Sequence, residues 1–191
     1  MSKFFKSTWF KCISVLLVLA VVLGGTLAIL NDVLYVSNEE RTMRAITKIY
    51  GEEKTFIIKH DQSQSDSAIE NEYGKINKIY LVGEDILFQA VGYNGYKNGT
   101  ITLWVQIKNN KIEKVIMESY DKQTLMSKLD GSFYQNFLID VTESFEKGEF
   151  FTPSNKSAVN YNPVSGATKS ANAGCNAINC IIKYLGENNE N

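Results

Sequence analysis

A threonine just before a predicted C-terminal helix is the residue of this chain best suited to chemistry. The stretch reads Asn162-Pro163-Val164-Ser165-Gly166-Ala167-Thr168, and the apolar stripe of the following helix covers residues 169–185. The first N–H groups of a helix lack intrahelical partners and carry the positive end of its dipole, so they favour an anion such as phosphate. Gly166 and Ala167 leave room there for a bulky group. The alternative is an ordinary N-cap, in which Thr168 binds no ligand.

A second element with small residues, Gly92-Tyr93-Asn94-Gly95, precedes a strand predicted over residues 101–107. Apolar and polar side chains alternate along that strand, which indicates that one of its faces is buried. Four aromatic residues nearby in the sequence could stack on a planar ligand, although such residues more often belong to the core of a sheet: Tyr93, Tyr96, Trp104 and Tyr120.

These two elements resemble the FMN-binding domain family found in the Rnf ion-translocating electron-transport complex and in the sodium-translocating NADH:quinone reductase. The motif of that family is Asp-x-x-(Ser/Thr)-Gly-Ala-Thr, and this chain has Asn162 at the position of the aspartate. The resemblance implies that a flavin transferase attaches FMN to Thr168 through a phosphoester bond. It also implies that Asn162, Ser165, Gly166 and Ala167 belong to the cofactor site.

The function implied by this resemblance is that of an electron-carrying subunit rather than of an enzyme acting alone. Its partners would be the other membrane subunits of an Rnf-like complex, in which electron transfer drives ion translocation, and a flavin transferase during maturation. Two alternatives stay open: a stand-alone extracellular flavoprotein with other redox partners, and an anchored binding module that carries no flavin.

The N-terminal region contains an uncharged run, residues 12–30, that is long enough to cross a membrane as a helix. Lys3, Lys6 and Lys11 precede the run, and acidic residues follow it, so the positive-inside rule predicts a cytoplasmic N-terminus and an exported C-terminal domain. A cleaved signal peptide has the same charge polarity. We expect a retained anchor, because the run is long for a signal peptide and no Ala-x-Ala site follows it.

Composition narrows the remaining classes of function. The chain has 191 residues, with 20 basic and 21 acidic side chains, and its net charge of −1 argues against a nucleic-acid partner. A single histidine and three cysteines leave few soft ligands, so we do not expect a four-coordinate structural zinc site. The composition and the apolar run therefore favour a membrane-associated protein that does not bind nucleic acid.

The remaining periodicities predict an α+β fold: one transmembrane helix, then an exported domain with a mainly antiparallel sheet and flanking helices. We expect helices over residues 37–51, 125–129, 133–145 and 169–185, the last ending before Gly186. Strands are expected over residues 55–59, 79–82, 86–92, 101–107 and 112–119, with a loop over 60–72 and a tight turn at Asn109-Asn110. The predicted organisation is a cytoplasmic N-terminus (1–11), the membrane span (12–30), a lead-in (31–75), the FMN-binding domain (76–186) and a tail (187–191).

Overall fold

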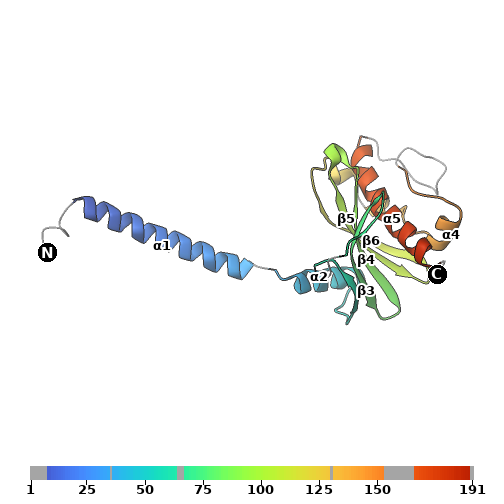
Figure 1. Ribbon diagram of the computed structural model, residues 1–191, viewed down its shortest axis with the longest axis horizontal. Helices are drawn as coiled ribbons and strands as arrows, with labels where there is room; N and C mark the ends of the chain where they lie inside the picture. The colour runs from blue at the N-terminus through green and yellow to red at the C-terminus, as the bar shows by residue number, and fades with distance from the viewer. Residues whose placement is uncertain (1–7, 35, 64–66, 130, 153–165, 190–191) are drawn as a thin grey trace. The chain divides into compact units, whose positions relative to one another are not determined.

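The computed structural model describes residues 8–34, 36–63, 67–129, 131–152 and 166–189, and the chain divides into two compact units, Met1–Thr42 and Met43–Asn191 (Figure 1). In the first unit, helix α1 (Thr8–Leu34) contains an apolar stretch, Lys11–Asn31, that is long enough to cross a membrane. By length and composition, such a helix near the N-terminus fits both a membrane anchor and a signal sequence.

Helix α2 (Asn38–Tyr50) has the ends that its sequence predicts. The hydroxyl of Ser37 accepts a hydrogen bond from the N–H of Glu40 (3.1 Å), as an N-cap does. At the other end Gly51 has a φ of +80°, and its N–H donates to the carbonyl of Thr47. A glycine in the left-handed conformation ends the helix because it carries no Cβ to clash.

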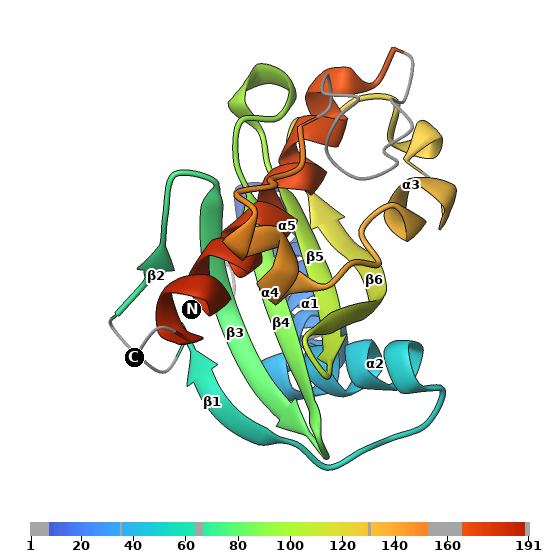
Figure 2. The ribbon, with the colours of Figure 1, turned by 90° about the vertical axis from the view of Figure 1, so that its right-hand side faces the viewer.

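The second unit is built on an antiparallel sheet with the order β1-β3-β4-β5-β6, and β2 also pairs with β3 (Figure 2). The strands are β1 (Ile57–Asp61), β2 (Ile69–Glu70), β3 (Gly74–Val82), β4 (Asp85–Gly92), β5 (Ile101–Lys108) and β6 (Lys111–Tyr120). Asn109 and Asn110 join β5 to β6, both with positive φ, as a type I′ hairpin turn requires. The α+β fold with a mainly antiparallel sheet is therefore confirmed.

The first strands of the sheet differ from their predicted bounds. β1 begins at Ile57 rather than at residue 55 and extends to Asp61. β2 forms inside the predicted loop over residues 60–72, and β3 begins at Gly74 rather than at residue 79. Asp61 is buried, and its carboxylate accepts hydrogen bonds from Ser63 and from the Tyr80 hydroxyl. Polar side chains satisfied in this way hide the C-terminal end of β1 from a search for alternating apolar residues.

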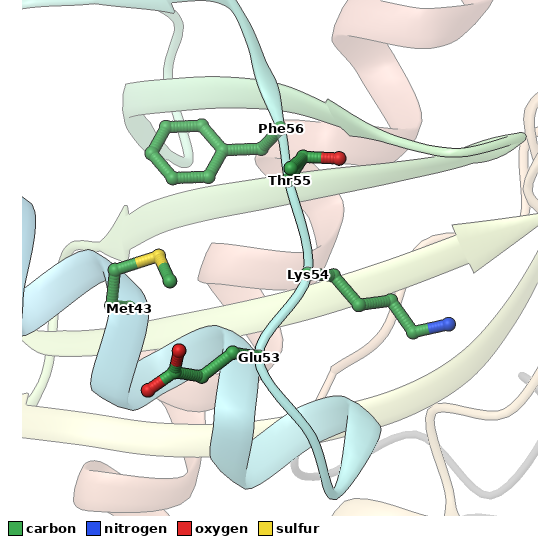
Figure 3. A pocket seen from close by; sticks show the side chains of 5 residues that line it. All are labelled: Met43, Glu53, Lys54, Thr55 and Phe56. Atoms are coloured by element: carbon green, nitrogen blue, oxygen red, sulfur yellow. The ribbon is translucent and has the colours of Figure 1, made fainter.

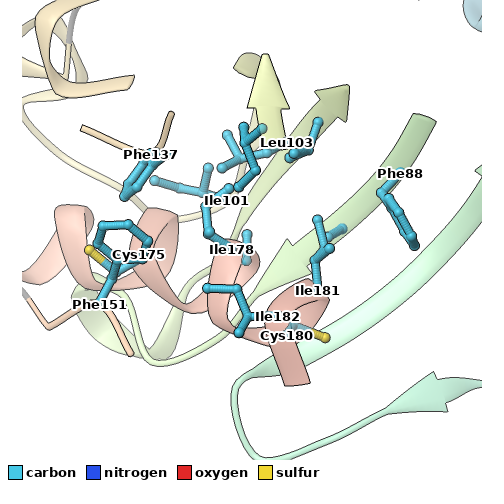
Figure 4. Close-up of a cluster of buried hydrophobic side chains, with 14 of the residues drawn as sticks. Phe88, Ile101, Leu103, Phe137, Phe151, Cys175, Ile178, Cys180, Ile181 and Ile182 are labelled. Atoms are coloured by element: carbon cyan, nitrogen blue, oxygen red, sulfur yellow. The ribbon is translucent and has the colours of Figure 1, made fainter. Parts of the chain in front are cut away.

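Helix α5 (Thr168–Asn189) covers one face of the sheet and supplies the main core (Figure 4). Ile178, Ile181 and Ile182 are fully buried against strand residues such as Phe88 and Leu103. Cys175 and Cys180 belong to the same core and are free thiols. Burial raises the pKa of Cys180 to about 12, so its thiol stays protonated at neutral pH.

The opposite face of the sheet carries a smaller core, formed with the C-terminal half of α2. Ile46 and Ile49 are buried with Tyr80, Leu87 and Trp104. The ammonium of Lys114, on β6, donates to the carbonyl of Ile49 at 2.7 Å, which satisfies an otherwise open carbonyl at the helix end. These contacts fix the end of α2 on a face of the sheet that α5 does not cover.

Three helix predictions need correction. The expected helix over 133–145 is two short helices, α3 (Gly131–Gln135) and α4 (Val141–Glu146), because Asp140 caps α4 and the N–H of Val141 donates to the carbonyl of Asn110. Residues 126–128 form only a 3-10 turn, η2 (Met126–Lys128). Gly186 lies inside α5 rather than beyond its end. It is a glycine because the Phe145 ring occupies the space that a side chain at this position would need.

Candidate functional site

Thr168 is the first residue of α5, and its side chain is exposed. The N–H of Ala171 donates to the carbonyl of Ala167 at 2.8 Å, so the N–H groups of residues 168–170 precede the helical hydrogen-bond ladder. This bond also makes Ala167 the N-cap residue, and a methyl group cannot accept a hydrogen bond from those N–H groups. The position of Thr168 therefore differs from that of an ordinary capping threonine.

The small residues before Thr168 have two different functions. Gly166 is exposed with a φ of +83°, a conformation that favours glycine. Ala167 is only 3% exposed and belongs to the main core, so it anchors the helix start rather than leaving room for a ligand. The other two predicted site residues, Asn162 and Ser165, lie outside the described part of the chain.

A lysine lies beside this helix start. The ammonium of Lys128, in η2, is 2.9 Å from the position that a Cβ on Gly166 would occupy. A cation and the positive end of the α5 dipole thus lie at the same place, and both favour a negatively charged ligand. The sequence analysis missed Lys128, because nothing in its local pattern connects it to a motif some forty residues later.

The predicted Gly92–Gly95 element contacts the beginning of α5. The side-chain amides of Asn172 and Asn176 donate to the carbonyls of Asn94 (2.8 Å) and Tyr93 (2.9 Å). A Cβ on Gly92 would approach the carbonyl oxygen of Ala173 to 1.8 Å, so only glycine allows this contact between strand and helix. The two elements singled out in the sequence are therefore neighbours in the fold.

A third segment, residues 121–125, also contacts the start of α5. The Ser170 hydroxyl donates to the carbonyl of Thr124 at 3.0 Å. Gln123 is buried: its Oε1 accepts from the N–H of Tyr96, and its Nε2 donates to the carbonyl of Asp121. Gln123 thus joins this segment to the 3-10 turn η1 (Tyr96–Asn98). Its function was not visible in the sequence, because both partners are backbone groups and one of them is distant along the chain.

Unusual backbone conformations are concentrated around the start of α5. Among the described residues other than glycine, seven have positive φ, and five of these belong to the segments that surround Thr168: Asn94, Lys97, Asn98, Lys122 and Leu125. Leu125 is the most unusual, because a bulky residue rarely adopts a φ of +57°, and its side chain is 50% exposed. Left-handed residues of this kind cluster at binding and catalytic sites.

The other features that could hold a ligand lie elsewhere. Trp104 is buried beside Tyr80, with ring centroids 6.1 Å apart, on the face that α2 covers. A pocket of about 480 Å³ lies between Met43 and Phe56, lined also by residues 53–55, and shares no element with the start of α5 (Figure 3). Within the described ranges, no three His, Cys, Asp or Glu side chains are grouped to hold a metal ion.

Comparison with protein families and with curated proteins finds no match for this chain. Its function is therefore inferred from the residues and from the geometry around Thr168.

Proposed function

We propose that the chain is a membrane-anchored flavoprotein that carries FMN on Thr168 through a phosphoester bond and passes electrons outside the membrane. The observation that carries the proposal is the exposed hydroxyl of Thr168 at a helix start whose N-cap is an alanine, with a lysine ammonium close by. The Ser165–Thr168 string resembles the flavin attachment motif, and this resemblance suggests that the anion is the phosphate of FMN.

The residues present fit the phosphate end of FMN. The N–H groups at the start of α5 and the ammonium of Lys128 would hold the phosphate oxygens, since hydrogen bonds from charged donors to phosphate are strong. The exposed Leu125 follows Thr124, which Ser170 holds by a hydrogen bond, so an apolar side chain is available near the attachment point. The bound FMN would supply the electron-carrying chemistry.

The fold contributes rigidity to this arrangement. Side chains of Ser170, Asn172 and Asn176 hold three backbone carbonyls of the surrounding loops, so the loops and the helix start form one connected unit. A site supported in this way holds a cofactor in a fixed orientation, which electron transfer requires. In the proposed setting, other membrane subunits of an Rnf-like complex donate and accept the electrons, and a flavin transferase makes the bond.

The proposal is tested by in-gel flavin fluorescence after denaturation of protein co-produced with a flavin transferase. We expect a covalent signal from the wild type and none from Thr168→Val. Thr55→Val is the matched control, because Thr55 is exposed and lies between α2 and β1, and it should be as fluorescent as the wild type. A wild type without any covalent signal would favour the binding module, whereas a fluorescent protein that purifies without other membrane subunits would favour the stand-alone flavoprotein.

A further inference from the structure

We propose that four lysines around Thr168 form a docking surface for an acidic partner protein. We call Lys97, Lys122, Lys128 and Lys169 the lysine rim. The proposal rests on the proposed function in one respect: the partner is taken to be an electron carrier that must approach the cofactor on Thr168. The existence of the docking surface itself depends only on the charges and on their arrangement.

The lysine rim is assembled from three segments that the fold brings to the start of α5. Lys169 follows Thr168, and the Lys128 ammonium lies beside Gly166. Lys122 lies two residues before Thr124, whose carbonyl accepts from Ser170. Lys97 belongs to η1, which contacts α5 and is joined to the 121–125 segment through Gln123. In Figure 2 the green turn η1 lies at the end of the sheet where α5 begins.

The charge at this end opposes that of the rest of the domain. Residues 31–191 carry 17 basic and 21 acidic side chains, a net charge of −4. The segments 92–99, 120–130 and 166–172 contain the four lysines and two acids, Asp121 and Asp130. Asp121 and Lys122 are 3.6 Å apart, but both side chains are more than 60% exposed, so this ion pair weakens the local field only slightly. The start of α5 is thus a basic region on an acidic domain.

The arrangement favours a protein surface over a small anion as the partner. All four lysines are exposed, and exposed apolar side chains lie in the same segments: Leu125 (50%) and Tyr120 (52%). Apolar side chains surrounded by charged ones are typical of interfaces between proteins. Exposed charges at the edge of such an interface mainly increase the rate of association and discriminate against partners of the wrong charge. The rim therefore selects an acidic surface and excludes a basic one.

The experiment measures how a fluorescent decaglutamate peptide binds to the full chain in nanodiscs of uncharged lipid. We expect binding at low salt that is lost at high salt, and no binding of a decalysine peptide. The double variant Lys97→Gln/Lys122→Gln should weaken binding about tenfold, because it removes two of the exposed charges that would pair with the peptide. The matched control is Lys54→Gln/Lys147→Gln, which removes two exposed lysines of other regions and should bind like the wild type.

Equal affinity of the lysine-rim variant and the wild type would overturn the proposal, as would equal weakening by the control. Vesicles rich in phosphatidylglycerol form a further arm: if they bind through the rim and the peptide does not, the partner is a lipid surface and the proposal is wrong. The peptide is also measured on Thr168→Val, which should bind it like the wild type when both are produced without a flavin transferase. Peptide binding without covalent flavin would contradict the proposed function alone, and flavin without peptide binding would contradict the docking surface alone.

Discussion

At the scale of single residues, the position of Ala167 separates the two interpretations of Thr168. A capping threonine would occupy the position before the first helical residue, but Ala167 is there and Thr168 is already helical. An alanine at the N-cap costs about 1 kcal/mol relative to serine or threonine. A phosphate bound to the same N–H groups would offset that cost, which is why the geometry supports an anion site more strongly than the sequence did.

The first prediction concerns Asn162, which replaces the aspartate of the family motif. An amide lacks the carboxylate charge that could hold a metal ion or orient the threonine hydroxyl during phosphoryl transfer. We therefore expect Asn162→Asp to increase the rate or extent of flavin loading on Thr168. The measurement is covalent fluorescence per mole of protein over time, with one transferase for both proteins. Equal or slower loading of the variant would show that this position is not limiting.

The second prediction uses the buried carboxylate of Asp61. Burial by itself raises its pKa, but hydrogen bonds from Ser63 and Tyr80 and the ammonium of Lys78 at 3.5 Å outweigh burial and lower the pKa below its usual value. A lowered pKa means that the ionised form stabilises the fold. This contribution is complete above the unfolded-state pKa of about 4 and is lost as the pH falls through the folded-state value.

Asp61→Asn should consequently lower the free energy of unfolding by about 1–3 kcal/mol at pH 7. The difference from the wild type should shrink below about pH 4, where the wild type loses its own contribution. Urea unfolding of the full chain in detergent, repeated over a range from acidic to neutral pH, measures both effects. Glu84→Gln removes an exposed carboxylate and serves as the control for net charge. A difference that stayed constant over this pH range would contradict the assignment.

At the scale of elements, α5 approaches β4 very closely beside the proposed site. A Cβ on Gly92 would lie 1.8 Å from the carbonyl oxygen of Ala173 and 2.4 Å from the nitrogen of Ala177, both backbone atoms of α5. Backbone atoms of a helix cannot move aside as the end of a side chain can. The helix would have to shift as a whole, together with the loops that Asn172 and Asn176 hold.

The third prediction is that Gly92→Ala destabilises the protein by about 3 kcal/mol and lowers its melting temperature by roughly 6–12 °C. Gly131→Ala is the matched control, because no atom lies within 4 Å of the Cβ it would add. The control should change the stability by less than about 0.5 kcal/mol. Near-UV circular dichroism of both variants on heating gives the comparison, and similar melting temperatures would refute the role assigned to this close contact.

Local sequence signals predicted the elements that depend on local physics. The Asn109-Asn110 turn and the apolar-polar alternation of β5 are examples. Both features depend only on the types of neighbouring residues. The end of α5 was misjudged because Gly186 serves contact with Phe145 rather than helix termination. In the site, the Gly92–Gly95 element and Thr168 were visible, but Lys128 and Gln123 act on groups brought close only by the fold.

At the scale of the whole molecule, the apolar helix α1 is long enough to cross a membrane, and the charges that flank it predict an orientation. The fourth prediction is that residues after Leu30 are exported, because Lys3, Lys6 and Lys11 precede the span. Protease added to intact spheroplasts should digest the domain and leave the N-terminus protected. Adding three lysines after Asn31 and replacing the three N-terminal ones with glutamine should reduce this digestion. Full protection of the wild-type domain would overturn the orientation and the supposed side of flavin transfer.

Peptide mass spectrometry of the full chain, co-produced with a flavin transferase, tests the attachment of FMN most directly. We predict a mass increase corresponding to FMN on the peptide that contains Thr168, and fragmentation that places the adduct on the Thr168 hydroxyl. Peptides that contain other exposed threonines, such as Thr55, should be unmodified. An adduct on a different residue would contradict the assignment of Thr168. So would an unmodified Thr168 peptide, provided that the same transferase modifies a known flavoprotein in parallel.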